Sequence, residues 1–276
     1  MEKMCRVFEV SSSGYYRWLA CPESATKREN RAIYNALKAS YEQNKGRIGL
    51  DKLLDDVRLK FPHCGRNRLY RIQRAYGLYS IRHHKFKATT NSRHNYPVAP
   101  NLLCQDFHVD GPNRVWVTDI TYIRTNEGWL YLAIVKDLFD RQIVGYATGS
   151  RIDSGLCKRA LSAAIRRYKP GAGLIHHSDQ GVQYASRDYQ NLLQKNHIIP
   201  SMSRKGVPYD NACAESFFST IKLEMVYHEH YETRVQAQAA IFDYIEIYYN
   251  RQRRNAAIGN VAPAEFRRRF YQQRAA

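Results

Sequence analysis

The sequence predicts an α/β protein in which a mixed five-stranded sheet with flanking helices follows a small all-α domain. Three observations support this fold class. Residues 115–148 hold three consecutive strand-like runs, rich in β-branched and aromatic side chains and joined by short turns. Helix-like and strand-like segments then alternate, which is typical of a sheet covered by helices. Residues 24–77 show only helical spacing, and a basic, irregular stretch separates them from the strands.

The composition points to a nucleic-acid partner. The chain has 276 residues, a formal net charge of +18 and a pI near 9.7, and its first 105 residues carry 20 basic but only 8 acidic side chains. The six cysteines include no CxxC pair, which fits free thiols better than disulfides or a zinc site. No apolar run reaches the 18 residues expected of a transmembrane helix. We therefore expect a cytoplasmic, nucleoid-associated protein whose N-terminal part makes the main contact with DNA.

Residues 24–77 are predicted to form a helix-turn-helix DNA-binding domain. Ser24 is a favourable cap for the first helix, and the expected helices span 24–44, 50–59 and 66–76. Arginines recur along the third helix, and in a major groove they would contact phosphates or guanine edges. A basic helix that is merely solvated is the alternative. The arginines are Arg66, Arg68, Arg71 and Arg74.

Two segments of weaker periodicity flank this domain. Residues 1–23 form an N-terminal junction segment with two short helical starts. Residues 78–105 form a basic linker in which lysine and arginine lie among threonine, asparagine, serine and proline. Such a run is usually only solvated, but beside a DNA-binding domain it would follow a phosphate backbone and add salt-dependent affinity.

The catalytic core is predicted over residues 106–230. Its first strand has apolar residues at alternate positions yet contains Asp119, a residue type that strands disfavour. Asp179 closes the fourth strand-like run, and Glu215 lies in a helix that opens at Asp210 and Asn211. Together with the intervening helices, the strands at 115–123, 129–139, 142–148, 174–178 and 198–199 give the order βββαβαβα.

Asp119, Asp179 and Glu215 are the candidate catalytic residues and metal ligands. Three converging carboxylates would raise one another's pKa values, and a divalent cation removes that conflict. An all-oxygen set suits Mg²⁺ or Mn²⁺, and two ions about 4 Å apart serve phosphodiester chemistry. Lys222 follows Glu215 by seven residues on the same helical face, where it would hold DNA unless it is a solvated surface lysine.

Other polar residues near these acids are weaker candidates for the site. His177 is more often a packing or hydrogen-bonding residue than a metal contact. Asn211 is expected to cap the following helix rather than to reach substrate. The acids Asp137 and Asp140 are expected to face away from the first three and to serve a turn or an ion pair with Arg141.

Several sequence blocks resemble one known family. WVTDITYI, HSDQGVQY and DNACAESFFSTIKLE occur in this order, and 35 residues separate Asp179 from Glu215. These blocks resemble those of D,D(35)E transposases with a retroviral-integrase-like core. They are most similar to the insertion-sequence transposases of the IS3 family, in which this region is the second of two overlapping reading frames (the OrfB type). Flanking matches from APNLL at 99–103 to YYNRQRRNAAIGNVAPAEF at 248–266 extend the resemblance over nearly the whole chain.

The resemblance implies a fold, a reaction and partners. The fold is RNase H-like, with the first and fourth strands as neighbours, and residues 231–276 form a helical, basic C-terminal segment that packs beside it. The reaction is metal-dependent cleavage at the 3′ ends of an insertion element and transfer of each 3′-hydroxyl into target DNA, with two Mg²⁺ or Mn²⁺ ions per active site. The partners are the terminal inverted repeats, the target DNA, further copies of the chain in a homodimer or higher synaptic assembly, and an upstream-frame product joined by frameshifting.

Two other functions stay open on the sequence alone. An RNase H-like nuclease would use the same core without strand transfer. A non-catalytic helix-turn-helix DNA-binding regulator would use the basic third helix and would not need the acids.

Overall fold

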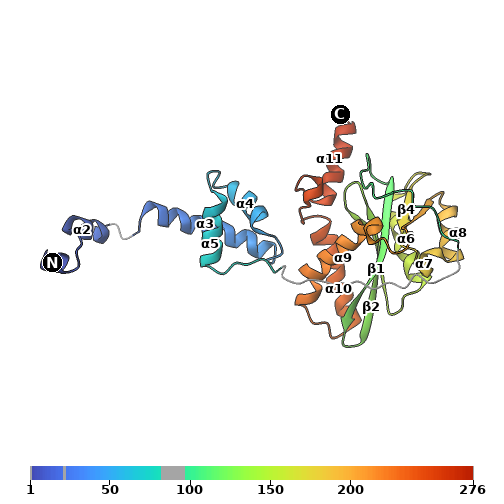
Figure 1. The fold of residues 1–276 in the computed structure, drawn as a ribbon, viewed down its shortest axis with the longest axis horizontal. Helices are drawn as coiled ribbons and strands as arrows, with labels where there is room; N and C mark the ends of the chain where they lie inside the picture. The colour runs from blue at the N-terminus through green and yellow to red at the C-terminus, as the bar shows by residue number, and fades with distance from the viewer. Residues whose placement is uncertain (1, 21–22, 82–96, 276) are drawn as a thin grey trace. The chain divides into compact units, whose positions relative to one another are not determined.

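The computed structural model describes residues 2–20, 23–81 and 97–275. They belong to two compact units, residues 1–84 and residues 85–276, and Figure 1 shows that the sheet lies in the second. Most of the predicted basic linker, residues 82–96, falls outside the described ranges. Within those ranges, none of the helices combines the length and the apolar character that a membrane crossing needs.

The first unit is helical, as predicted. Ser24 caps α3 by accepting a hydrogen bond from the Lys27 amide (3.2 Å), and Asn44 follows its last turn. The side chains of Leu37, Leu53 and Leu69 are fully buried where three helices pack together. The helices are α1 (Glu2–Val7), α2 (Ser12–Ala20), α3 (Ala25–Gln43), α4 (Leu50–Arg58) and α5 (Arg66–Ala75).

The second unit contains the mixed five-stranded sheet that the sequence predicted. The strands are β1 (Val115–Thr125), β2 (Gly128–Asp137), β3 (Ile143–Gly149), β4 (Ile175–Ser178) and β5 (Ile199–Met202). Their order is β3-β2-β1-β4-β5; β2 is antiparallel to both neighbours, and β1, β4 and β5 are parallel. This is the RNase H-like topology, and Val117 of β1 lies opposite His177 of β4.

Helices cover both faces of the sheet (Figure 1). One apolar core joins the sheet to the first group of helices through Trp116, Leu161 and Tyr189, and the other joins it to the second group through Ile123 and Phe217. The first group is α6 (Ser154–Tyr168), α7 (Val182–Ala185) and α8 (Arg187–Lys195). The second is α9 (Ala212–Glu224), α10 (Arg234–Phe242) and the π-helical segment η3 (Asp243–Tyr249).

The backbone approaches closely where α6 crosses β3. A Cβ atom at Gly145 would lie 2.4 Å from the carbonyl oxygen of Ala160, so only glycine fits at this position. At the start of α10, Thr233 and Gln236 form a reciprocal capping box.

The C-terminal helix α11 (Pro263–Ala275) is joined to the sheet by a buried ion-pair cluster. Arg267 donates to Asp137 (2.7 Å) and also pairs with Asp140, and both carboxyl groups are fully buried. The predicted ion pair with Arg141 is therefore wrong, but the predicted turn role is confirmed: Asp137 accepts a hydrogen bond from the Phe139 amide (2.9 Å) and Asp140 from the Gln142 amide (2.9 Å). Their ion-pair partner lies more than 120 residues further along the chain, where local sequence patterns carry no information about it.

Candidate active site

Asp119 faces the helix that carries Glu215. Side chains alternate between the two faces of a strand, and Val117 and Ile123, which share the parity of Asp119, pack on the α9 side of the sheet. Asp119 is half-buried, and its Oδ1 accepts a hydrogen bond from the Ile120 amide (2.8 Å). The strand therefore presents one carboxylate to α9 on a face that otherwise carries valine, isoleucine and threonine.

Asp179 directly follows β4, the parallel neighbour of β1. Its Oδ1 accepts a hydrogen bond from the Gly181 amide (2.9 Å), which fixes the carboxylate on the turn into α7. A Cβ atom at position 181 would lie 2.9 Å from that same oxygen. Glycine at this turn thus leaves room for the carboxylate.

Glu215 lies in the first turn of α9, with its side chain exposed. The helix is anchored beneath it by Ala214, Phe217 and Ile221, which are buried against the sheet. An acidic residue in the first turn also interacts favourably with the helix dipole. The fold therefore fixes the backbone position of Glu215 and leaves its carboxylate facing solvent.

The three carboxylates act on one another electrostatically. Burial and the charges of Asp179 and Glu215 raise the pKa of Asp119 well above its ordinary value, against the opposing effects of the Ile120 amide and Lys222. Burial and the charge of Asp179 likewise raise the pKa of Glu215. The three acids thus lie close enough for electrostatic interaction.

The donor set fits a hard divalent cation. It offers carboxylate oxygens, the ligands that Mg²⁺ and Mn²⁺ prefer, and a cation would relieve the mutual repulsion. Among the described residues, no group of three or more His, Cys, Asp or Glu side chains is already arranged to hold a metal ion. The carboxylates are neighbours, and binding a cation would draw their oxygens together.

Lys222 lies on the same side of α9 as the acids, and it is buried rather than solvated. Its Nζ lies 4.8 Å from the centroid of the Tyr122 ring. Burial lowers the pKa of Lys222, whereas the charge of Asp119 raises it. A cation is therefore held beside the candidate catalytic acids.

His177 and Asn211 are both buried and make hydrogen bonds close to the candidate acids in sequence. His177 is fully buried between the hydroxyls of Ser201 (2.9 Å) and Ser203 (3.0 Å), and burial lowers its pKa to about 4. Asn211 is the N-cap residue of α9, but its side chain makes no capping hydrogen bond, so the expected cap is wrong. Its amide instead donates to the carbonyl oxygen of Thr118 in β1 (3.2 Å).

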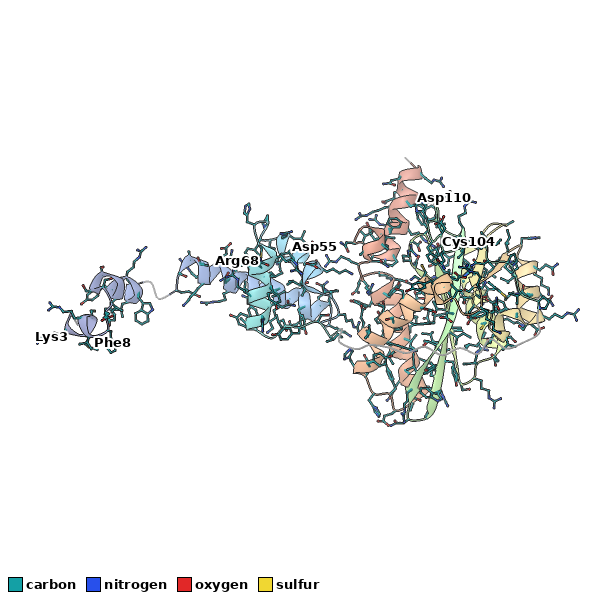
Figure 2. The ribbon with its side chains drawn as sticks, in the orientation of Figure 1. Lys3, Phe8, Asp55, Arg68, Cys104 and Asp110 are labelled. Atoms are coloured by element: carbon teal, nitrogen blue, oxygen red, sulfur yellow. The ribbon has the colours of Figure 1, made fainter. Side chains whose placement is uncertain are left out.

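The arginines of α5 fall into two pairs. Arg66 pairs with Asp51 (2.7 Å). Arg68, labelled in Figure 2, is half-buried and bonds to Glu29 and Asn30 of α3. Arg71 and Arg74 are exposed on the same helix, and the Nε of Arg71 donates only a long hydrogen bond (3.4 Å) to its own helix backbone.

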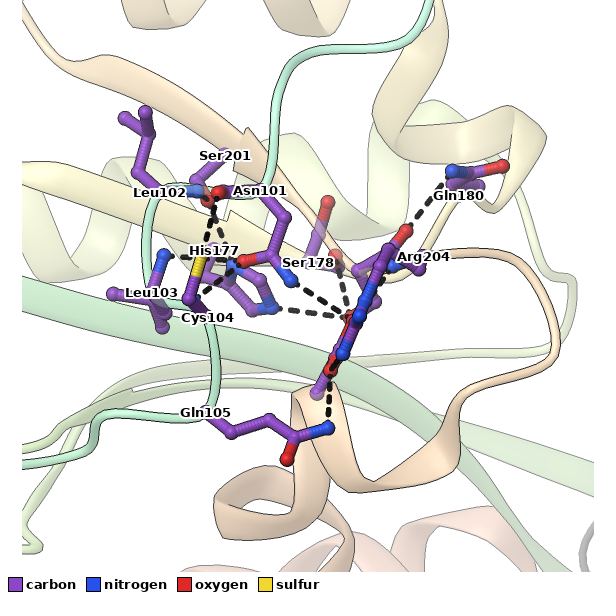
Figure 3. A network of polar contacts seen from close by, with 12 residues as sticks. Asn101, Leu102, Leu103, Cys104, Gln105, His177, Ser178, Gln180, Ser201 and Arg204 are labelled. Carbon is purple, nitrogen blue, oxygen red and sulfur yellow. Dashed lines mark hydrogen bonds and ion pairs between the residues drawn. The ribbon is translucent and has the colours of Figure 1, made fainter.

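Sequence patterns missed the role of Asp210, which they marked only as a helix-capping type. Its carboxylate is fully buried and accepts hydrogen bonds from Arg204, Asn101 and Gln105 (Figure 3). The bond with Arg204 lowers the pKa of Asp210 far below its usual range. Two of these partners lie more than 100 residues away, so no local spacing indicates them.

Known proteins resemble this chain in sequence and fold. Two integrase core domain models match residues 109–208 and 215–270. The uncharacterized 31 kDa protein of insertion element IS600 from Shigella sonnei is 44% identical over 272 residues, 99% of this chain and 100% of the relative. Transposase InsF for insertion sequence IS3A from Escherichia coli (strain K12) is 38% identical over 268 residues, 96% of this chain and 93% of the relative. A simian T-cell lymphotropic virus intasome structure aligns with a TM-score of 0.48 and 16% identity, over 75% of this chain and 72% of that one.

Proposed function

Since the chain belongs to the IS3 family of insertion-sequence transposases, we propose that it moves DNA by using Asp119, Asp179 and Glu215 as its catalytic residues. The observation that carries this proposal is the convergence of the three acids from β1, the end of β4 and the first turn of α9, close enough to alter one another's ionisation. Repulsion among converging carboxylates destabilises a fold, and acids with perturbed pKa values are typical of functional sites.

The same acids would hold the metal. We propose that Asp119, Asp179 and Glu215 together would hold two Mg²⁺ or Mn²⁺ ions. When bound, such ions activate an attacking oxygen and stabilise a leaving one in phosphodiester chemistry. The protein contributes the fixed placement of the carboxylates on a strand, a strand end and a helix.

The reaction proceeds in two displacements at phosphorus. Water attacks a phosphodiester at the end of the element, the bond from phosphorus to the 3′ oxygen breaks, and a free 3′-hydroxyl results. That hydroxyl then attacks a phosphate of the target strand, forms a new phosphodiester and releases a target 3′-hydroxyl. One phosphodiester replaces another in the second step, so neither ATP nor a covalent enzyme intermediate is needed.

Cations of the chain would position the DNA. Lys222, beside Asp119, would hold a phosphate next to the scissile bond. In the helix-turn-helix region, Arg71 and Arg74 have side chains exposed for DNA contact, whereas Arg66 and Arg68 already form ion pairs within the unit. The partners are the terminal inverted repeats of an element and a target duplex. Because two DNA ends must be held together, we also propose a homodimer or higher assembly. The family resemblance further implies an upstream-frame product joined by frameshifting, which we also propose.

A strand-transfer assay tests this function. A duplex carrying a pre-cleaved 3′-hydroxyl end is incubated with plasmid and MgCl₂, and joined products are counted. We expect joining by the wild-type chain and its loss by at least about 1000-fold in Asp119→Asn, Asp179→Asn and Glu215→Gln. Cutting without joining would identify a nuclease. A function that survives Asp119→Asn would identify a DNA-binding regulator.

A further inference from the structure

The segment between β5 and α9 is fixed by one buried carboxylate. Asp210 accepts hydrogen bonds from the backbone amide of Arg204 (2.9 Å) and from the Nε and Nη2 of its guanidinium (3.0 Å each). The side-chain amides of Asn101 and Gln105 donate to the same carboxylate, each at 2.9 Å (Figure 3). The start of α9 is thereby joined both to the preceding loop and to the segment that leads into the sheet.

The other end of this loop is bonded to the residues that flank Asp179. The Ser203 amide donates to the carbonyl oxygen of Ser178 (2.9 Å), and the Gln180 side chain donates to the carbonyl oxygen of Ser203 (2.9 Å). His177 bonds to the Ser203 hydroxyl from beneath. Ser203 and Arg204 are adjacent in sequence, so their hydrogen bonds connect the Asp179 turn to the start of α9.

Asn211 makes the corresponding connection to β1. Its amide nitrogen donates to the carbonyl oxygen of Thr118, the residue before Asp119. Asn211 precedes Glu215 by four residues, about one helical turn. In the described part of the chain, its buried Oδ1 has no hydrogen-bond partner, and leaving such an atom unpaired costs about 1–3 kcal/mol.

We propose that Asp210 and Asn211 are positioning residues for the metal-binding carboxylates. Asp210 fixes the Glu215 helix to the strand end that carries Asp179, and Asn211 fixes it to the strand that carries Asp119. Mutual repulsion pushes the three acids apart, and these two contacts oppose that displacement and keep Glu215 within reach of a shared cation. This inference rests on the proposed function, because it assigns the contacts a role in that site.

The test measures metal binding separately from catalysis. Mn²⁺ is titrated calorimetrically into the full chain without DNA, and strand transfer is measured against MgCl₂ concentration. For Asp210→Asn and Asn211→Ala we expect the Mn²⁺ Kd and the half-saturating Mg²⁺ concentration to rise about tenfold, equivalent to about 1.4 kcal/mol. Affinity for the DNA end should not change. Asn211→Ala leaves the Asp210 hydrogen bonds in place, so it provides a folded variant if Asp210→Asn unfolds.

Asp140→Asn is the matched control, because it also removes a buried carboxylate that pairs with an arginine. It should leave the Mn²⁺ Kd unchanged. The positioning roles are overturned if Asn211→Ala and any folded Asp210→Asn bind Mn²⁺ as tightly as the wild type and lose activity only in proportion to the unfolded fraction. A wild-type chain that binds Mn²⁺ but never joins DNA would instead contradict the proposed function.

Discussion

At the scale of single residues, Asp119 combines a cost in stability with a proposed role in catalysis. Its carboxylate is half-buried in the field of two other acids, and its pKa is raised for that reason. A raised carboxyl pKa means that the folded state holds the proton more tightly, so stability falls as pH rises above the ordinary value near 3.8.

The Asp119→Asn variant should therefore be more stable than the wild type when no metal is present. At pH 7.5 in EDTA, we expect its melting temperature to rise by roughly 2–4 °C, or about 1 kcal/mol. Added Mg²⁺ should stabilise the wild type and not the variant. Exposed Asp188→Asn on α8 is the control, and equal stabilisation of all three proteins by Mg²⁺ would contradict the assignment.

His176 gives the fold a separate sensitivity to acid. It is buried against the Tyr189 hydroxyl (3.0 Å), and burial lowers its pKa from 6.5 to about 3. The unfolded chain takes up this proton first, so the stability contribution is complete above pH 6.5 and is lost as pH falls toward 3.

Between pH 7.5 and pH 5, the wild type should lose roughly 2 kcal/mol through His176. Urea unfolding of wild type and His176→Gln at both pH values measures the difference. The variant should show a shallower pH dependence by that amount. His230→Gln, at an exposed histidine, should retain the wild-type slope, and parallel slopes in all three proteins would refute the account.

At the scale of secondary-structure elements, the sequence predicted what local patterns determine. Alternating apolar residues in β1 and helical spacing in α9 suffice to place Asp119 and Glu215 on their elements. The contact of Asn211 could not be predicted in this way. Asparagine often caps helices through a local hydrogen bond. Here the Asn211 amide instead donates to the carbonyl oxygen of Thr118, in a strand 93 residues away.

The arginines of helix α5 are proposed to divide between stabilising the unit and contacting DNA. Replacing Arg71 and Arg74 together by alanine should weaken DNA binding at least about tenfold and reduce the salt dependence by about two counterions, because both side chains are exposed. Arg68→Ala should mainly lower stability, by about 1 kcal/mol, through loss of its contacts with Glu29 and Asn30. Binding isotherms at several salt concentrations, beside unfolding curves, distinguish these outcomes; equal effects on affinity would contradict the division.

At the scale of the whole molecule, residues far apart in sequence complete the catalytic unit. The Tyr244 and Ile241 side chains pack into the same core as Ile123. Arg267 of α11 forms ion pairs with the buried carboxylates of Asp137 and Asp140. The sequence predicted a basic helical tail but not this partner, because charge pairing across more than 120 residues leaves no periodic signal.

The Arg267→Met variant should be strongly destabilised. It leaves two buried carboxylates without their cation, and breaking such a pair costs about 3–5 kcal/mol. Arg268→Met, which removes an exposed pair with Glu265 on the same helix, should cost less than about 1 kcal/mol. Chemical unfolding measures both, and similar losses would show that the buried cluster contributes little.

Asp119, Asp179 and Glu215 are proposed to bind metal together. Iron-directed cleavage of the chain is a direct test of this shared metal site. With Fe²⁺ in place of Mg²⁺, ascorbate and peroxide generate hydroxyl radicals that cut the backbone beside the bound ion. We predict cuts near residues 119, 179 and 215 that excess Mg²⁺ suppresses and that Asp119→Asn abolishes. Cuts that Mg²⁺ does not suppress, or Mg²⁺-sensitive cuts confined to other acids such as Asp137 and Asp140, would contradict the account.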